Sequence, residues 1–202
     1  MPPVLWDVLA ATPPPPDLSG LRDRALLLVG FVGALRRSEL AAVEAAHLGE
    51  HPRGVVLTIP RSKTDLYAEG QLVALPYSSR PERCPATALQ GWLDAAGIAD
   101  GPVFRPVPRG GKRALPRGID EGAINRAVQR ACIRAALGLD GRRFSAHSLR
   151  AGLAPYASQR GASDRAIAHQ TRHRLLGSLD QNIRHETAWT DNAATALDLW
   201  AR

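Results

Sequence analysis

Apolar residues recur along this chain at the spacing of helices that bury one face or lie wholly inside a core. Residues 21–32 are apolar nearly all round, which predicts a core helix with Ser19 as its N-cap. Gly33 breaks this pattern, and a short second helix is expected from Arg37 to about Val43. Further helices are predicted over residues 85–96, from Asp120 to about 135, from His147 onward, over 163–169, over 176–183 and over 191–200.

Two short segments follow a strand pattern instead. Residues 55–59 and 71–75 are rich in β-formers and flank a polar turn over 61–70, which predicts an antiparallel hairpin. Residues 101–118 are rich in proline, glycine and basic residues, which is typical of a surface loop. The predicted fold class is therefore α+β, mostly helical with one small antiparallel sheet.

The N-terminal segment is expected to lie outside this domain. Residues 1–19 contain four consecutive prolines at 13–16, so we expect an extended linker that is not helical. The chain of 202 residues is long enough to bury a sizeable core. We therefore expect one domain over residues 20–202, preceded by the linker.

The charge is distributed unevenly. The net charge is +7 and the pI is about 10.4, yet residues 105–184 hold 16 Lys and Arg against 5 Asp and Glu. A basic half on a near-neutral body is typical of a protein that binds a polyanion, of which nucleic acid is the commonest. A basic half that only aids solubility is the alternative.

Little indicates a secreted, membrane or metal-binding protein. Cys84 and Cys132 are the two cysteines, without metal-ligand spacing. The longest apolar run, residues 25–35, is too short to span a membrane, and the N-terminus has no basic segment of the signal-peptide type. We expect a cytoplasmic protein without metal or cofactor.

Two local pairs suggest a site for a phosphate. His147 and Arg150 stand three residues apart at a predicted helix start, where free backbone N–H groups favour an anion. Arg36 lies at a helix break in an apolar region and needs a partner, which Glu39 can supply. Taken alone, the first pair also fits a solvated helix face, and the second a simple cap.

Two further residues extend this set. Lys63, in the hairpin turn, is one of two lysines beside 24 arginines, and a lysine can act as a general acid where arginine cannot. Its presence by chance is the alternative. His173 stands between Arg172 and Arg174, neighbours that favour a phosphate-binding role over a core position.

In this order and at these spacings, the set resembles the tyrosine recombinase (phage integrase) family, from about residue 21 to residue 199. The family's first arginine and its acidic partner, its hairpin lysine, its His-x-x-Arg pair and its later His/Trp position fall on Arg36, Glu39, Lys63, His147, Arg150 and His173.

The resemblance implies a mechanism and a partner. Two arginines would neutralise the scissile phosphate of double-stranded DNA, the histidines would hydrogen-bond it, and the lysine would protonate the leaving 5′ oxygen. A tyrosine would attack phosphorus and form a covalent link, without metal or ATP. Homo-oligomers, or assemblies with active recombinases on DNA, and a place at the nucleoid are implied as well.

The chain departs from the family at the nucleophile. The family's tyrosine lies nine residues after the second histidine, and here that position is Asn182, which has no ionisable oxygen. Tyr67, Tyr77 and Tyr156 are poor substitutes by position. Three lesser departures are Arg172 in place of a glycine, Pro155 within a predicted helix, and the lack of the family's N-terminal DNA-clamping domain.

We therefore expect a DNA-binding domain of the recombinase/integrase type, concerned with DNA recombination and DNA integration of a mobile genetic element, and degenerate at its nucleophile. The residues leave open whether it is an enzyme. One alternative is a non-catalytic DNA-binding or recombinase-modulating protein that docks through residues 192–200. Others are an enzyme whose tyrosine comes from another chain, and a relic without a role.

Overall fold

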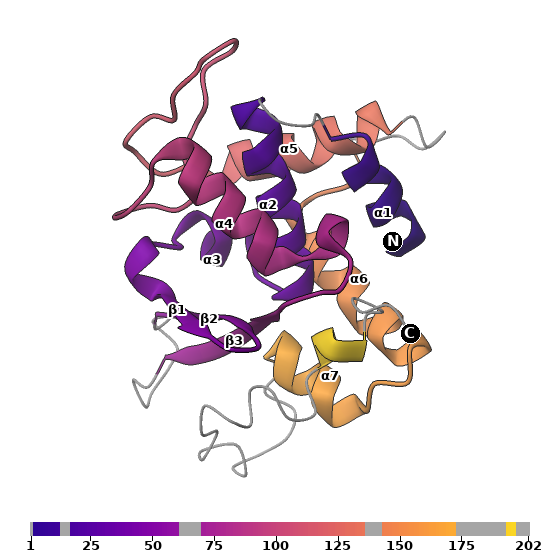
Figure 1. Ribbon diagram of the computed structural model, residues 1–202. Coiled ribbons are helices and arrows are strands. Elements are labelled where there is room, and N and C mark those ends of the chain that lie inside the picture. The colour runs from indigo at the N-terminus through magenta and orange to yellow at the C-terminus, as the bar shows by residue number, and fades with distance from the viewer. Residues whose placement is uncertain (1, 13–16, 61–69, 136–142, 173–192, 197–202) are drawn as a thin grey trace.

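The central helix of the fold is α2 (Leu18–Val32). Figure 1 shows the computed structural model, which describes residues 2–12, 17–60, 70–135, 143–172 and 193–196. Helix α2 is buried along most of its length, as its apolar pattern predicts. Its N-cap is Asp17 and not Ser19, because the Asp17 carboxylate accepts a 3.0 Å hydrogen bond from the Gly20 amide.

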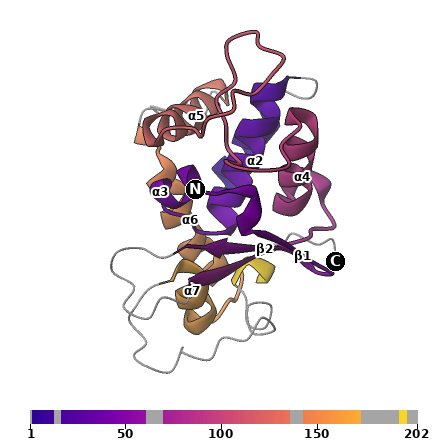
Figure 2. The same ribbon diagram turned by 90° about the vertical axis from the view of Figure 1, so that its left-hand side faces the viewer.

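Three helices of 12 to 14 residues pack around α2. Helix α4 (Pro85–Ala96) packs on one side, and α5 (Glu121–Arg134) and α6 (Ala146–Gln159) pack on the other (Figures 1 and 2). The bounds predicted for α4 are correct. In α5, Asp120 caps the first turn, and the helix buries Ile124, Val128, Ala131 and Cys132, while its C-cap Ala135 is half-buried. Helix α6 begins at Ala146 and continues through Pro155 to Gln159.

The sheet has three antiparallel strands in the order β1 (Leu48–His51), β2 (Gly54–Ile59) and β3 (Gln71–Pro76). The predicted hairpin is formed by β2 and β3, with Val55 opposite Leu75 and Ile59 opposite Gln71. Strand β1 was not expected, because a four-residue segment with one large apolar side chain carries too little pattern. Short 3₁₀ helices precede β1 (η1, Ala45–His47) and α4 (η2, Pro81–Arg83).

Two short helices connect these layers. Helix α3 (Arg37–Ala41) follows α2 and is two residues shorter than expected, while α7 (Asp164–Thr171) extends two residues beyond its predicted end. Figure 2 shows the sheet between α2 and α7. The Gln170 side chain joins these parts, because it donates to the carbonyls of Val32 (2.6 Å) and Ala74 (3.4 Å).

The C-terminal predictions are described only in part. The helix predicted over residues 176–183 lies outside the described residues. Of the helix predicted over 191–200, the structure describes one 3₁₀ turn, η5 (Ala193–Ala196).

The expectation of an extended N-terminal segment is wrong for its first part. Residues Pro2–Ala10 form helix α1, which buries Leu5, Val8 and Leu9 against the core. Apolar spacing of three and four residues favours a helix here, and prolines are tolerated in the first helical turn. The later prolines follow the helix and do not prevent it. Segment 1–19 is therefore not wholly a linker, since α1 belongs to the same core.

Close packing around α2 sets the position of α6. A Cβ built at Gly30 would lie 3.0 Å from the Leu149 Cδ1 of α6 and 3.0 Å from the Leu40 Cδ1 of α3. Glycine at this position allows α6 to approach the end of α2, and Arg150 follows directly after Leu149.

Candidate functional site

The turn that ends α2 is the centre of the candidate site. Ala34 is buried and has φ 48°, in the left-handed region that few residues other than glycine adopt. The Leu35 amide donates to the Gly30 carbonyl at 3.1 Å, which closes the helix end. This geometry leaves the carbonyls of Gly33 and Ala34 free to accept hydrogen bonds from side chains elsewhere in the chain.

The predicted pair Arg36–Glu39 is present at the start of α3. The Glu39 carboxylate accepts from the Arg36 guanidinium at 2.6 Å and from the Arg36 backbone amide at 2.7 Å. The Arg36 side chain is 52% exposed and that of Glu39 is 12% exposed. The guanidinium of Arg36 therefore faces solvent, while its carboxylate partner is held within the protein.

Arg150 lies beside this pair. Its guanidinium is buried and donates to the carbonyls of Ala34 (2.5 Å) and Thr171. Burial, together with the positive charges of Arg172 and Arg36, lowers the pKa of Arg150 to about 10, against the opposing effect of Glu39. Arg36 and Arg150, far apart in sequence, thus share one electrostatic environment.

A third guanidinium, that of Arg172, completes what we call the arginine cluster (Arg36, Arg150, Arg172 and Glu39). Arg172 is the C-cap of α7 and has φ 54°. Its side chain is 4% exposed and donates to the carbonyls of Gly33 (2.9 Å) and Ala34 (3.1 Å) and to the Glu39 carboxylate (2.6 Å). The sequence suggested a departure at this position, whereas the structure places the side chain inside the site.

The cluster has an excess of positive charge. Three guanidinium groups surround one carboxylate, a net charge of +2. Burial would raise the pKa of Glu39, but the charge of Arg172 and the hydrogen bonds and charge of Arg36 lower it below its usual value. Burial lowers the pKa of Arg172, and Glu39 opposes that effect. An anion would compensate the remaining charge.

Donors for such an anion are present. A guanidinium has five N–H groups. Among the described residues, Arg150 uses two of these groups on carbonyls and Arg36 uses one on Glu39. The remaining donors, above all on the half-exposed Arg36, suit an oxyanion such as a phosphate.

The other predicted site residues are only partly described. His147 is exposed in the first turn of α6, and it has no hydrogen bond or ion pair within the described part of the chain. The N-terminus of α6 is attached to α5, because the Ala146 amide donates to the Asn125 side chain at 3.1 Å. Lys63, His173 and Asn182 lie outside the described residues.

The two described tyrosines, Tyr77 and Tyr156, form no hydrogen bond or ring contact with the arginine cluster. Tyr156 is buried, and its hydroxyl accepts from the Trp6 indole at 3.4 Å. Its ring packs against Trp6 and Phe31, with centroids 6.4 and 6.2 Å apart. Tyr77 is 46% exposed just after β3. Tyr67 lies outside the described residues.

A second basic feature is the loop between α4 and α5, residues 105–118, which we call the basic loop. The Leu115 amide donates to the Pro106 carbonyl at 2.9 Å, and the Ile119 amide donates to the Phe104 carbonyl at 2.8 Å. Figure 2 shows the loop projecting from the end of the molecule opposite α7. Four exposed cations stand on it, none with an ion pair among the described residues: Arg109, Lys112, Arg113 and Arg117.

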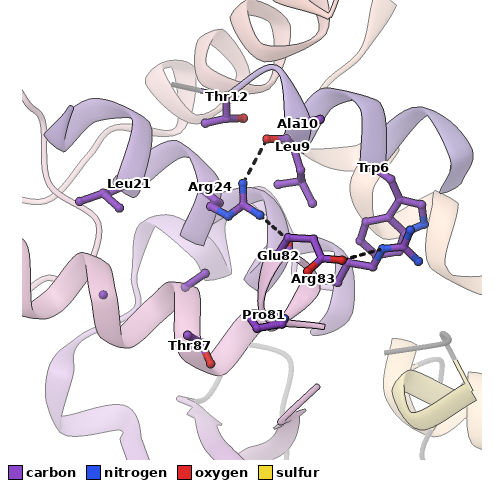
Figure 3. A pocket seen from close by; sticks show the side chains of 12 residues that line it. Trp6, Leu9, Ala10, Thr12, Leu21, Arg24, Pro81, Glu82, Arg83 and Thr87 are labelled. Carbon is purple, nitrogen blue, oxygen red and sulfur yellow. Dashed lines mark hydrogen bonds and ion pairs between the residues drawn. The ribbon is translucent and has the colours of Figure 1, made fainter. Parts of the chain in front are cut away.

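A pocket of about 610 Å³ lies among α1, α2, η2 and α4. Figure 3 shows Arg24 within it, donating to the carbonyls of Leu9 (3.1 Å) and Glu82 (2.5 Å). None of the candidate catalytic residues lines this pocket. Within the described part of the chain, no helix is long and apolar enough to cross a membrane, and no three or more His, Cys, Asp or Glu side chains are grouped to hold a metal.

Proteins that are similar to this chain in sequence or in fold include recombinases and integrases. No family model matches the chain. It is 38% identical over 180 residues to an "Integrase/recombinase xerD homolog" from Selenomonas ruminantium, a match that covers 89% of this chain and 52% of that protein. The chain spans about half the length of this curated relative.

Solved structures of recombinases and integrases share the fold. The integrase of mycobacterium phage Brujita aligns with a TM-score of 0.58 at 21% identity, over 89% of this chain and 52% of that one. The XerH site-specific recombinase, in a post-cleavage complex with palindromic difH, aligns with a TM-score of 0.60 at 17% identity, over 97% and 48%. This chain shares with these structures a fold that is mostly helical and has a small antiparallel sheet.

Proposed function

We propose that this chain is a DNA-binding domain of the site-specific recombinase/integrase type, which holds one phosphodiester of duplex DNA against the arginine cluster. The observation that carries the proposal is that Arg150 donates to the Ala34 carbonyl, two residues before Arg36, within a cluster whose net charge is +2. The two arginines come from segments more than a hundred residues apart, so a local cap does not account for their meeting.

The proposed chemistry assigns each residue a role at the phosphate. Arg36 and Arg150 neutralise the non-bridging oxygens, whose charge grows as phosphorus becomes five-coordinate. His147, exposed at the N-terminus of α6, donates to the same phosphate. Lys63 protonates the leaving 5′ oxygen and His173 hydrogen-bonds the phosphate, roles that rest on the sequence resemblance.

The proposal gives the domain no nucleophile of its own. Asn182 stands at the tyrosine position, and an amide cannot form a phosphoester with DNA. The core position of Tyr156 supports this view, since its hydroxyl is engaged by Trp6. We therefore propose that the domain binds DNA at the nucleoid without cleaving it, either as its own oligomer or beside active recombinases.

Two further observations support DNA as the partner. The XerH neighbours were solved bound to difH DNA, in pre-cleavage and post-cleavage complexes. The basic loop of this chain presents four exposed cations without acidic partners among the described residues, a surface that suits the phosphate backbone. We propose that residues 20–202 correspond to the catalytic domain of the longer relatives.

The proposal is tested by trapping covalent adducts. The wild-type chain and the variant Asn182→Tyr are incubated with nicked duplexes of randomised sequence, and complexes that resist detergent are counted. We expect DNA binding by both proteins, no adduct from the wild type, and an adduct from Asn182→Tyr that disappears when Arg150→Gln is added. An adduct from the wild type would overturn the proposal that the domain has no nucleophile of its own.

Other outcomes separate the alternatives. Binding without any adduct from Asn182→Tyr would favour a non-catalytic DNA-binding or recombinase-modulating protein. An adduct formed only after a tyrosine-bearing relative is added would favour a nucleophile supplied by another chain. The absence of DNA binding by the wild type would overturn the proposed function.

A further inference from the structure

We propose that Arg172 is a positioning residue that holds both phosphate-binding arginines, Arg36 and Arg150, in the geometry that receives the anion. The inference rests on the proposed function for the identity of the anion. Its structural basis is separate, since it follows from the contacts of Arg172 with the turn that ends α2 and with Glu39.

The first link leads from Arg172 to Arg150. Both guanidinium groups donate to the same acceptor, the Ala34 carbonyl, at 3.1 Å and 2.5 Å. Arg172 also donates to the Gly33 carbonyl at 2.9 Å. It therefore contacts two successive carbonyls of a turn whose φ at Ala34 is 48°. Holding that turn fixes the direction of the carbonyl that Arg150 requires.

The second link leads from Arg172 to Arg36. The Glu39 oxygen that accepts from Arg172 at 2.6 Å also accepts from the Arg36 backbone amide at 2.7 Å. The other oxygen of Glu39 accepts from the Arg36 guanidinium at 2.6 Å. Arg172 thus fixes the carboxylate from the interior side, and the carboxylate fixes Arg36 on the solvent side.

Arg172 does not itself offer donors to a ligand. Its side chain is 4% exposed, and both terminal nitrogens already donate to protein oxygens. Its Nε is buried and has no hydrogen-bond partner among the described residues. A group placed in this way acts through its neighbours and does not touch substrate.

The backbone conformation of Arg172 indicates that its side chain has a role. Arg172 has φ 54°, the left-handed region in which glycine is favoured. Glycine would fit the backbone better, so the arginine is held there by its side-chain contacts. The docking of α7 does not depend on Arg172 alone, because Gln170 bonds the Val32 carbonyl at 2.6 Å. Gln170 is therefore a matched control on the same helix end.

The test compares Arg172→Gly, Arg172→Lys and Gln170→Ala in the full chain. The first readout is the ¹⁵N NMR signal of the Arg150 guanidinium without ligand, assigned through its loss in Arg150→Lys. The second readout is the affinity for inorganic phosphate at constant ionic strength. The variant Arg172→Gly removes the side chain without adding backbone strain, and Arg172→Lys keeps the charge but not the spread of donors.

We expect the Arg150 signals to broaden or shift in Arg172→Gly and to keep their wild-type positions in Gln170→Ala. Phosphate affinity should fall about tenfold in Arg172→Gly, because charge-assisted hydrogen bonds to the anion are misplaced, and should change less than about twofold in Gln170→Ala. The variant Arg172→Lys should lie between Arg172→Gly and the wild type in both readouts.

Three outcomes would overturn the inference. The first is that Arg172→Gly keeps the wild-type Arg150 signals and the wild-type phosphate affinity. The second is that Gln170→Ala loses as much phosphate affinity as Arg172→Gly. The third applies if Arg172→Gly does not fold, and is that Arg172→Lys keeps the wild-type signals and affinity. The failure of the proposed function has a different signature. The wild type would then not bind phosphate, while the Arg150 signals would still depend on Arg172.

Discussion

Replacing Glu39 by glutamine removes the carboxylate of the arginine cluster while keeping nearly the same shape. Glu39 bonds Arg172, whose side chain is 4% exposed, and Arg36, whose side chain is 52% exposed. The substitution leaves the buried guanidinium of Arg172 beside Arg150 without a compensating charge. We expect the variant to fold with a lower free energy of unfolding.

The magnitude follows from the burial of the two partners. Two unit charges about 4 Å apart interact by about 4 kcal/mol at an effective dielectric constant of about 20. Removing one partner of a buried pair costs about 3–5 kcal/mol, whereas an exposed pair contributes about 0–1 kcal/mol. Because glutamine keeps one acceptor oxygen, we expect a loss of about 3 kcal/mol at pH 7. For a chain of this length, that corresponds to a fall in Tm of about 6–12 °C.

The loss should depend on pH in one direction. The pKa of Glu39 in the folded protein lies below its usual value, so this carboxylate contributes full stability above the usual value of about 4.3. As the pH falls below that value, the unfolded chain takes up a proton before the folded chain does, and the contribution is lost. The difference between wild type and Glu39→Gln should therefore be constant from pH 6 to 8 and shrink below about pH 4.3.

Urea unfolding followed by tryptophan fluorescence measures this difference. The control is Glu121→Gln, which removes an exposed pair with Arg37 at a similar distance, 2.7 Å, with side chains 47% and 45% exposed. The control should lose less than about 1 kcal/mol. An equal loss in both variants, or a difference that persists unchanged at pH 3, would refute the reasoning from burial.

Three further predictions concern other parts of the molecule. Replacing the four cations of the basic loop by serine should lower the slope of log affinity for DNA against log salt by up to about 4, and an unchanged slope would exclude the loop as a DNA contact. The variant Gly30→Val should lose about 2 kcal/mol in urea unfolding, because its side chain would meet Leu149 at 3.0 Å, and wild-type stability would show that α6 shifts freely. The variant Tyr156→Phe should lose about 1 kcal/mol with unchanged DNA affinity, since the hydroxyl bonds only Trp6 and Arg160 among the described residues, and loss of DNA binding would contradict its core position.

Features determined by local sequence were predictable. The bounds of α4 follow from Pro85 at its first position and Gly97, with φ 63°, directly after its end. The pair Arg36–Glu39 spans three residues, so helical spacing alone indicates it. The hairpin of β2 and β3 follows from two β-rich runs around one polar turn.

Features determined by distant contacts were not predictable. Three of the acceptors of Arg172 lie 133 to 139 residues earlier in the chain, at Gly33, Ala34 and Glu39. No local pattern shows that these residues meet, so the position suggested a departure from the family. Helix α1 was not predicted either, because the four prolines that follow it favour an extended segment, although Leu5, Val8 and Leu9 have helical spacing.

The guanidinium groups of Arg150 and Arg172 are held mainly by oxygens of the main chain, those of Gly33, Ala34 and Thr171. A peptide oxygen is present whatever side chain a residue carries, so mutation at these three positions cannot delete it and can only redirect it. Tolerance to sequence drift is therefore decided by local backbone conformation more than by residue identity. A chain that has lost its nucleophile would keep the ability to grip an anion for as long as this turn keeps its shape.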